Sequence, residues 1–377
     1  AVIIGILLGF VANEGFMNFV VTVKYILGQL IFFMVPLIIL GFVSYSIAKM
    51  KDNASKMLSL ALIIAYLSSI GAAFFAMVSG YTLIPHLSIE PVKETLRQLP
   101  ELIFRLDIPP VVSVMTALVL AIMIGLATVW TKSEVFENLL DNFQKMVLLL
   151  INRILIPILP FFIAANFCAL SYEGAITKQL PVFLGVMVIV IISQFVWLSF
   201  LYVLAGAISK KNPWQVLKYY GPAYLTAVGT MSSAATLAVA LRCAQKSSVL
   251  RRDMVDFGIP LFANIHLCGS VLTEVFFVMT VSQVLYGKLP EPLTMVLFCL
   301  LLGIFAVGAP GVPGGTVMAS LGLIISVLGF DDTGTGLMMT IFALQDSFGT
   351  ACNVTGDGAL TLMLTGYAKK HNIHEAP

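Results

Sequence analysis

The sequence predicts an all-α polytopic membrane protein, on the basis of its composition, the length of its apolar runs and the placement of its basic residues. Of its 377 residues, 59% are hydrophobic and 11% are charged, and the mean hydropathy is +1.00. Soluble domains carry about 25% charged residues, so a soluble core cannot absorb this much apolar surface. Runs such as 57–83 and 182–207 exceed the roughly 20 residues that a helix needs to cross a bilayer.

Apolar runs of this kind predict eight membrane-spanning helices, near residues 1–23, 25–49, 57–84, 109–131, 144–171, 180–208, 253–285 and 334–367. The chain opens directly in an apolar run, which we interpret as a trimmed first span rather than a signal peptide. Basic residues gather in four groups between the spans: Lys49, Lys51 and Lys56; Lys210, Lys211 and Lys218; Arg251 and Arg252; Lys369 and Lys370. The positive-inside rule places all four groups in the cytoplasm. Both termini are then cytoplasmic, residues 86–107 lie outside, and we expect a multi-pass protein of a bacterial-type inner membrane.

Two apolar stretches, 220–248 and 292–328, do not fit this topology as crossings because each begins and ends on one side. Their centres, 230–236 and 308–316, are rich in residues that break helices. Each stretch is therefore predicted to be a re-entrant hairpin, and two hairpins of opposite orientation are typical of secondary transporters with inverted repeats. The site should lie where the tips meet. An ordinary extramembrane loop at 311–315 is the alternative.

A polar stripe runs along the last predicted span. At about 100° per residue, one helix face carries Asp346, Thr350, Asn353 and Asp357. A carboxylate at the centre of a membrane helix costs roughly 2.5–3.5 kcal/mol on insertion scales, so ion or substrate binding is expected. Asp357 and Asn353 could offer oxygen ligands to a small hard cation, and Asp346 and Thr350 could hold an ammonium group. The alternative is a hydrogen-bond network between spans.

A second stripe interrupts the preceding span, where His266, Ser270 and Glu274 follow at i+4 spacing. Histidine and glutamate on one membrane-helix face are candidate proton carriers, although a histidine in a membrane also serves as hydrogen-bonded structure. Ser68 and Ser69 in the third span are candidate ion ligands. Hydroxyls bonded to their own helix backbone are the simpler interpretation.

These residues resemble the dicarboxylate/amino acid:cation symporter family, which includes the glutamate and neutral amino acid transporters. The similarity runs from about Pro36 to Ala368, and it rests on the motifs at 232–237 (Ser-Ser-Ala-Ala-Thr-Leu), 311–315 (Gly-Val-Pro-Gly-Gly) and 353–357 (Asn-Val-Thr-Gly-Asp). The resemblance implies a homotrimer that moves its substrate by an elevator mechanism.

The resemblance also implies a division of the chain into a scaffold and a mobile transport domain. The scaffold would hold helices 1 and 2 (1–56) and helices 4 and 5 (109–176). The transport domain would hold helix 3 (57–84) and residues 177–377, while residues 85–108 form an extracellular loop. Within 177–377, hairpin 1 is expected at about 212–250 and hairpin 2 at about 290–330, with helices 6, 7 and 8 around them.

Matched residue by residue, Asp346 corresponds to the aspartate that binds the substrate amino group and Asp357 to a sodium-binding aspartate. The substrate-binding positions implied by the resemblance are Ser232, Ser233, Ser270, Val312, Gly314, Asp346, Gly349, Thr350 and Asn353. The implied cation site holds Asp357, Asn353 and His266, with Ser68 and Ser69 as weaker candidates. Proton coupling would fall to His266 and Glu274, since Glu274 matches a proton-binding glutamate of eukaryotic relatives.

Two departures from the family pattern shape the expected function. Carriers of acidic amino acids have an arginine where this chain has Gly349, and its loss removes charge-assisted bonds worth about 1.5–3 kcal/mol. The family's Asn-Met-Asp-Gly-Thr is His266-Leu-Cys268-Gly-Ser270 here, and a thiol cannot replace a carboxylate for a hard cation. We therefore expect import of a small or neutral amino acid with reduced sodium coupling or with proton coupling. A sodium-coupled carrier of dicarboxylates or acidic amino acids is the alternative.

An intramembrane enzyme is the alternative of a different class, because serine, histidine and aspartate all occur within the apolar runs. No nucleophile motif or ligand-spaced metal cluster in the sequence supports it. The five cysteines lack metal-ligand spacing, which indicates core residues without disulfides or zinc. The net charge of +2 is too small and too scattered for a nucleic-acid surface. We expect no enzymatic activity, no cofactor beyond Na+ or H+ as coupling ions, and a small molecule and the bilayer as partners.

Overall fold

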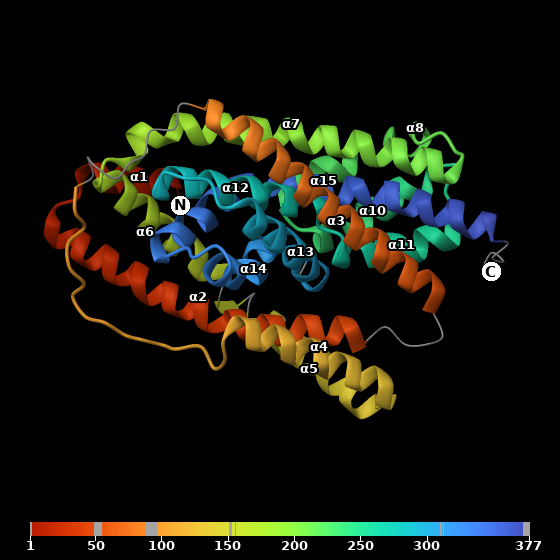
Figure 1. Ribbon diagram of the computed structural model, residues 1–377, viewed down its shortest axis with the longest axis horizontal. Helices are drawn as coiled ribbons and strands as arrows, with labels where there is room; N and C mark the ends of the chain where they lie inside the picture. Colours follow the sequence, from red (N-terminus) through yellow and green to blue (C-terminus); the bar gives the residue numbers. More distant parts are fainter. Residues whose placement is uncertain are drawn as a thin grey trace.

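The computed structural model describes residues 2–48, 55–87, 97–150, 153–154, 156–309, 311 and 313–371, and their regular structure is helical (Figure 1). The first half holds α1 (Val2–Val11), α2 (Glu14–Ala48), α3 (Ser55–Leu83) with a short 3-10 helix (Ile84–His86), α4 (Val114–Thr131), α5 (Glu134–Leu150), α6 (Ile156–Tyr172) and α7 (Ala175–Ser209). The second half holds α8 (Trp214–Leu217), α9 (Gly221–Thr230), α10 (Ser233–Gln245), α11 (Arg252–Ile265), α12 (Cys268–Tyr286), α13 (Pro292–Gly308), α14 (Gly315–Ser326) and α15 (Asp332–Lys370). The prediction of an all-α protein is confirmed.

Three stretches of the described chain are long and apolar enough to cross a membrane: Ser59–His86, Phe183–Ser209 and Leu261–Tyr286. Apolar side chains such as Leu184 and Val188 on α7 are more than half exposed, as expected of a lipid-facing or subunit-facing surface. The chain is thus a multi-pass membrane protein by helix length and composition. The number of eight crossings stays a prediction.

The predicted boundary between the first two spans, near Lys24, is wrong. The helix breaks at Ala12 and Asn13 instead, and the Asn13 Oδ1 accepts the N–H of Phe16 at 2.8 Å, which caps the start of α2. Lys24 therefore lies inside one continuous helix of 35 residues. The side of the membrane on which the N-terminus lies stays a prediction.

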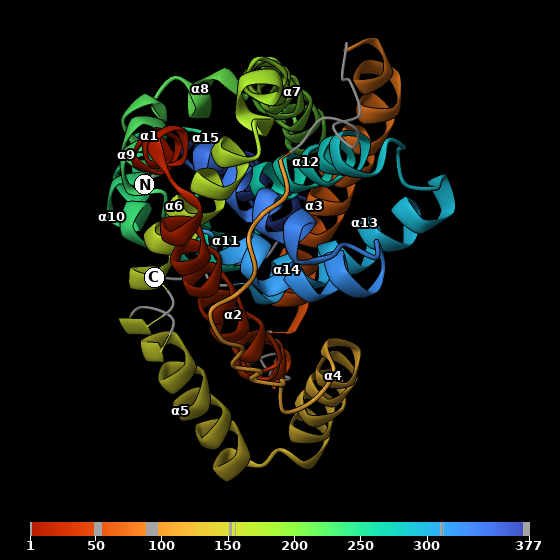
Figure 2. The same ribbon diagram turned by 90° about the vertical axis from the view of Figure 1, so that its left-hand side faces the viewer.

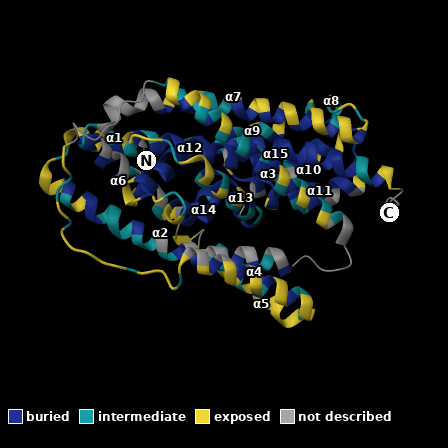
Figure 3. Cartoon of the chain, viewed as in Figure 1, coloured by how far each residue is buried: buried dark blue, intermediate teal, exposed yellow. Residues whose placement is uncertain are grey.

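The buried centre of the molecule is formed by α12 and α15, which pack against each other (Figures 1 and 3). α3 and α7 flank them, while α4 and α5 project from the rest of the chain (Figure 2). Every described residue of α12 from Cys268 to Ser282 is buried, although Thr273, Glu274 and Thr280 are polar. Such a polar centre needs internal hydrogen-bond partners.

Two pairs of short helices form the expected hairpins: α9 and α10 lie within the predicted 212–250, and α13 and α14 lie within 290–330. The first pair is interrupted at Met231, whose φ of 49° is left-handed. The second is interrupted after Gly308, and Gly314 precedes α14 with a φ of 70°. Pro310 and Val312 lie outside the described residues.

The predicted span 253–285 is two helices, α11 and α12, separated at His266 and Leu267. His266 has extended backbone angles, with φ −120° and ψ 105°. The prediction that His266, Ser270 and Glu274 share one helix face is therefore wrong, because His266 is not in the helix that carries the other two. By contrast, α15 is continuous, so Asp346, Thr350, Asn353 and Asp357 do share one helix.

Candidate functional site

The tips of the two hairpins contact each other, and the substrate site is expected at this place. The Ser232 hydroxyl donates to the Gly311 carbonyl oxygen at 2.7 Å. The neighbouring Ser233 is buried, and its hydroxyl has no hydrogen-bond partner among the described residues. Ser232 thus links the hairpins, while Ser233 keeps a free donor and acceptor beside the contact. The remaining tip candidate, Val312, lies outside the described residues.

The carboxylate of Asp346 on α15 lies at the tip of the second hairpin. Its Oδ2 accepts the backbone N–H of Gly314 at 2.7 Å, and its Oδ1 accepts the Thr350 hydroxyl at 3.5 Å. Asp346 and Thr350 are each 4% exposed. The structure therefore brings three of the predicted substrate-binding residues together. Their two donors leave lone pairs of the carboxylate for an incoming ammonium group.

Asn353, one turn further along α15, caps the start of α12. Its Oδ1 accepts the N–H groups of Gly269 at 2.7 Å and Ser270 at 3.2 Å, and its Nδ2 donates to the Ser270 hydroxyl at 2.9 Å. The first N–H groups of a helix lack intrahelical acceptors, so this side chain stabilises the helix end. In this structure Asn353 takes part in a hydrogen-bond network between helices, which is the alternative interpretation of the polar stripe. Its contacts with a substrate or a cation stay predictions.

His266 bridges α3 and α15 at the break between α11 and α12. Its Nδ1 lies 2.9 Å from the Asp357 Oδ1, and its Nε2 lies 2.9 Å from the Ser68 Oγ. All three residues are buried, His266 and Asp357 completely. The other carboxylate oxygen of Asp357 and the hydroxyl of Ser69 have no hydrogen-bond partner among the described residues. The structure thus brings three of the predicted cation-site residues, Ser68, His266 and Asp357, to one place, with the imidazole between the two candidate oxygen ligands.

Glu274 faces the second hairpin rather than His266. Its Oε1 accepts a hydrogen bond from the Ser320 hydroxyl of α14, and its Oε2 has no partner among the described residues. Glu274 and Ser320 are completely buried. The two predicted proton carriers therefore contact different elements, with His266 bonded to α3 and α15 and Glu274 bonded to α14.

Gly349 allows α12 to approach α15 closely. A Cβ atom at this position would lie 3.3 Å from the Ser270 Cα, which is tighter than an ordinary carbon contact. Ser270 therefore fills the space beside Gly349. Any side chain at this position would therefore press against the start of α12.

Sequence reasoning missed residues that complete this network. Gln194 of α7 donates to the Thr273 hydroxyl at 2.8 Å, and Tyr202 of α7 donates to the Thr355 carbonyl at 2.8 Å. Gln194 is a polar residue in the middle of a long apolar run, as His266 is, and this pattern could have identified it as a candidate. Ser320 carried none, because serine is common in membrane helices.

Within the described residues there is no group of three or more histidine, cysteine, aspartate or glutamate side chains that could hold a metal ion. A binding site for an alkali cation would instead use hydroxyl and carbonyl oxygens together with one carboxylate. Ser68 and Asp357 supply such oxygens, and in this structure the His266 ring is hydrogen-bonded to both of them.

Paired helical hairpins that meet tip to tip beside a polar membrane helix with buried carboxylates are typical of secondary transporters with inverted repeats. The chain belongs to the sodium:dicarboxylate symporter family, whose pattern matches residues 1–367. This agrees with the resemblance seen in the sequence motifs and with the expectation of a transporter rather than an enzyme.

Among similar proteins are excitatory amino acid transporters. The chain is 27% identical to excitatory amino acid transporter 2 of Homo sapiens over 203 residues, which are 52% of this chain and 34% of that protein. It is 25% identical to excitatory amino acid transporter 1 of Homo sapiens over 225 residues, or 59% of this chain and 40% of that protein. The similarity thus spans less than half the length of these relatives.

Proposed function

We propose that the protein is a secondary active symporter that imports a small or neutral amino acid, with proton coupling in place of part of the sodium coupling. Membership of the sodium:dicarboxylate symporter family supports cation-coupled symport. The names of the similar excitatory amino acid transporters support an amino acid as the substrate. The bridge from Ser68 through His266 to Asp357 carries the proposal for the coupling ion.

The bridge can gain and lose a proton without breaking either hydrogen bond. In the neutral ring, Nδ1–H donates to Asp357 and Nε2 accepts from the Ser68 hydroxyl; in the imidazolium, Nε2–H donates to the same hydroxyl. A serine hydroxyl can donate or accept, so it suits both states. The imidazolium would place one positive charge between Ser68 and Asp357, where a bound cation would otherwise neutralise the carboxylate.

Glu274 supplies a second candidate for proton coupling, linked to the hairpin instead of to Asp357. Its Oε1 can accept from Ser320 in either state, and a protonated carboxyl could in addition donate from Oε2, which no described residue binds. Because Ser320 belongs to α14, the proton state of Glu274 would affect how the second hairpin packs on α12. The second hairpin is proposed to be the outer gate.

For the substrate, we propose that its ammonium group binds Asp346, whose carboxylate is held by Gly314 and Thr350. Closure of the hairpin tip over Asp346 would exclude water from the bound amino acid. Gly349 offers no cation for a second carboxylate, which supports a neutral side chain. A dicarboxylate or acidic amino acid with sodium is the second candidate, favoured by the family description.

The proposed mechanism is an elevator movement in a homotrimer of a bacterial-type inner membrane. The scaffold would comprise residues 1–56 and 109–176, and the transport domain residues 57–84 and 177–377. Contacts of α12 and α15 with α3 and α7 support a single transport body, since these helices pack against one another. The projecting pair α4 and α5 supports a role of these helices in contacts between subunits.

The test is uptake of a panel of labelled amino acids and dicarboxylates into proteoliposomes, under a sodium gradient and separately under a proton gradient. We expect an unchanged neutral amino acid to accumulate under the proton gradient, and Asp357→Asn to abolish accumulation. Accumulation of an acidic substrate driven by sodium alone would establish the second candidate. A chemically altered product would overturn the transporter assignment.

A further inference from the structure

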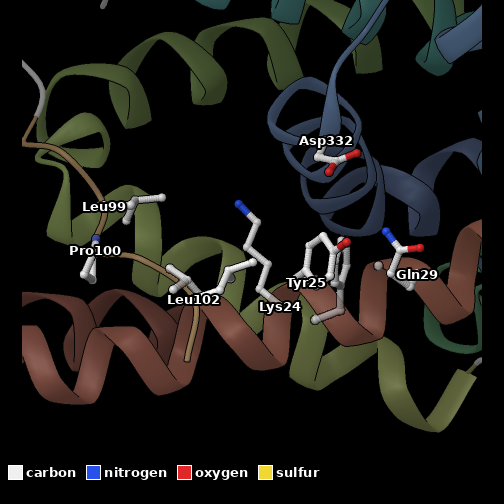
Figure 4. A pocket seen from close by; sticks show the side chains of 10 residues that line it. Lys24, Tyr25, Gln29, Leu99, Pro100, Leu102 and Asp332 are labelled. Atoms are coloured by element: carbon white, nitrogen blue, oxygen red, sulfur yellow. The ribbon is translucent and has the colours of Figure 1, made fainter. Parts of the chain in front are cut away.

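A cavity of about 210 Å³ lies between α2, the segment 97–108 that crosses it, α6 and the start of α15 (Figure 4). It is separate from the hairpin tips and from Asp346. Its polar lining comprises Lys24, Tyr25, Gln29 and Asp332. Its apolar lining includes Leu99 and Leu102 of the crossing segment. Polar groups at fixed positions in an otherwise apolar pocket are characteristic of small-molecule sites.

The wall formed by the crossing segment is held in place by side chains of α2. Thr22 accepts the N–H of Ile103 at 2.9 Å, and the Gln29 side chain accepts the N–H of Ile108 at 3.1 Å. Between them, the Tyr25 hydroxyl donates to Asp107. These bonds order an extended segment that has no regular structure of its own, so the cavity has a preformed wall.

Lys24 has no hydrogen bond or ion pair with the described residues. Its side chain points from α2 into the space below the start of α15, and Asp332 lies across that space (Figure 4). Asp331, Asp332 and Glu173 are the carboxylates that act on it electrostatically. A half-buried ammonium group without a bonded partner has an unused capacity for three hydrogen bonds.

The arrangement of charges selects the chemistry of a ligand. A simple anion bound to Lys24 would be repelled by Asp332 in the same lining, and a simple cation bound to Asp332 would be repelled by Lys24. A zwitterion satisfies both groups, with its carboxylate on Lys24 and its ammonium on Asp332. The leucines of the wall then contact an apolar side chain.

We propose that this cavity is a second binding site, for a zwitterionic amino acid with an apolar side chain. Binding there would also affect transport, and this consequence rests on the proposed function. Lys24 belongs to the proposed scaffold and Asp332 to the proposed transport domain. A ligand that joins them would favour the conformation described here, and excess amino acid would slow uptake.

The test uses a diazirine-bearing leucine with the purified full chain, followed by mass spectrometry. We expect label in the tryptic peptide 98–105, which contains Leu99 and Leu102. Lys24→Met and Asp332→Asn should each lower that label by about tenfold, the effect of losing one charge-assisted bond. Lys369→Met and Glu291→Gln, which change exposed charges elsewhere, are the matched controls and should leave it unchanged.

Competition identifies the ligand class. Leucine should protect the peptide, whereas leucinamide, which lacks the carboxylate, and 4-methylpentanoate, which lacks the amine, should not. Asp346→Asn should leave the label on 98–105 unchanged, because that residue belongs to the other site. Loss of this label in Asp346→Asn, protection by either singly charged analogue, or full labelling of Lys24→Met would each overturn the proposal. Since binding is measured without transport, the result is independent of the uptake experiment.

Discussion

At the scale of single residues, Asn353 shows how a side chain that looks like a ligand also holds the fold together. It occupies two N–H groups and one hydroxyl at the start of α12. Asp357, four residues on, has one oxygen that no described residue binds. Both residues belong to one polar stripe of the sequence. Only the structure shows that Asn353 caps a helix, whereas Asp357 has an oxygen available for a ligand.

Replacing Asn353 with alanine should therefore destabilise the protein. The buried N–H groups of Gly269 and Ser270 would lose their acceptor, at a cost of about 1–3 kcal/mol for each group left without a partner. A clear fall in Tm in detergent, followed by tryptophan fluorescence, is expected. Asn18→Ala, which removes a bond to the carbonyl of Glu101 at an exposed position, is the control. An unchanged Tm for Asn353→Ala would show that water replaces the cap.

The identity of the polar residues was predictable from the sequence, because a charged or amide group within an apolar run is costly and needs a reason. Their partners were not. The i+4 spacing suggested that His266 and Glu274 act together, but the extended backbone at His266 turns the ring toward Asp357 and Ser68. Spacing predicts a shared face only while the helix continues.

At the scale of elements, the close approach of α12 and α15 depends on glycine at the contact. Gly269 lies in the first turn of α12, where an added Cβ would collide with the Gly349 carbonyl oxygen and with Cys352 Cβ. Both helices are buried there. Backbone atoms cannot move aside as a flexible side chain can, so the two helices would have to separate.

In an ordinary helix position, replacing glycine with alanine raises stability by roughly 0.5–1 kcal/mol. Gly269→Ala should instead lower stability, because the cost of the collision exceeds this gain. It should also weaken amino acid binding, because the displaced α12 carries Ser270. Thermal unfolding and binding of the labelled substrate measure both effects. Gly185→Ala in α7, where a Cβ meets nothing within 4 Å, is the matched control. Equal stability of the two variants would contradict the packing described here.

The hairpins were the most predictable elements, because helix-breaking residues stand in the middle of stretches that cannot complete a crossing. The boundary between α1 and α2 was not. A lysine within an apolar run resembles the end of a span, whereas an asparagine cap at residue 13 gives a weaker signal. Lys24 is tolerated inside α2 because it lies in a cavity with carboxylates nearby.

At the scale of the whole molecule, the sequence predicted the helical fold because the apolar runs set the helices. The tertiary arrangement brings Glu173, in the turn between α6 and α7, near Lys24 of α2. Burial raises the pKa of the Glu173 carboxyl from its ordinary 4.5, and the charge of Lys24 partly opposes that rise. Sequence position alone could not have predicted the burial of this turn residue.

The raised pKa makes stability depend on pH. The folded state holds the Glu173 proton more tightly than the unfolded state does. The protonated carboxyl therefore adds to the free energy of unfolding below pH 4.5, and this contribution is lost as pH rises through the folded pKa. Glu173→Gln should therefore raise Tm at pH 7.5, by about 1–2 °C, with the difference shrinking toward pH 4.5. Glu291→Gln is the exposed control. A gain for Glu173→Gln that is the same at both pH values would contradict this assignment.

The central claim is that His266 stands in for a cation between Ser68 and Asp357. The most direct test is the dependence of initial uptake on sodium concentration at fixed pH, in the wild type and in His266→Asn/Cys268→Asp, which restores the family residues at both positions. His86→Asn, an exposed substitution, is the control. We expect wild-type uptake that follows an imposed proton gradient and depends only weakly on sodium, and a double variant whose uptake depends more strongly on sodium. Wild-type uptake that follows sodium, with no response to a proton gradient, would contradict it.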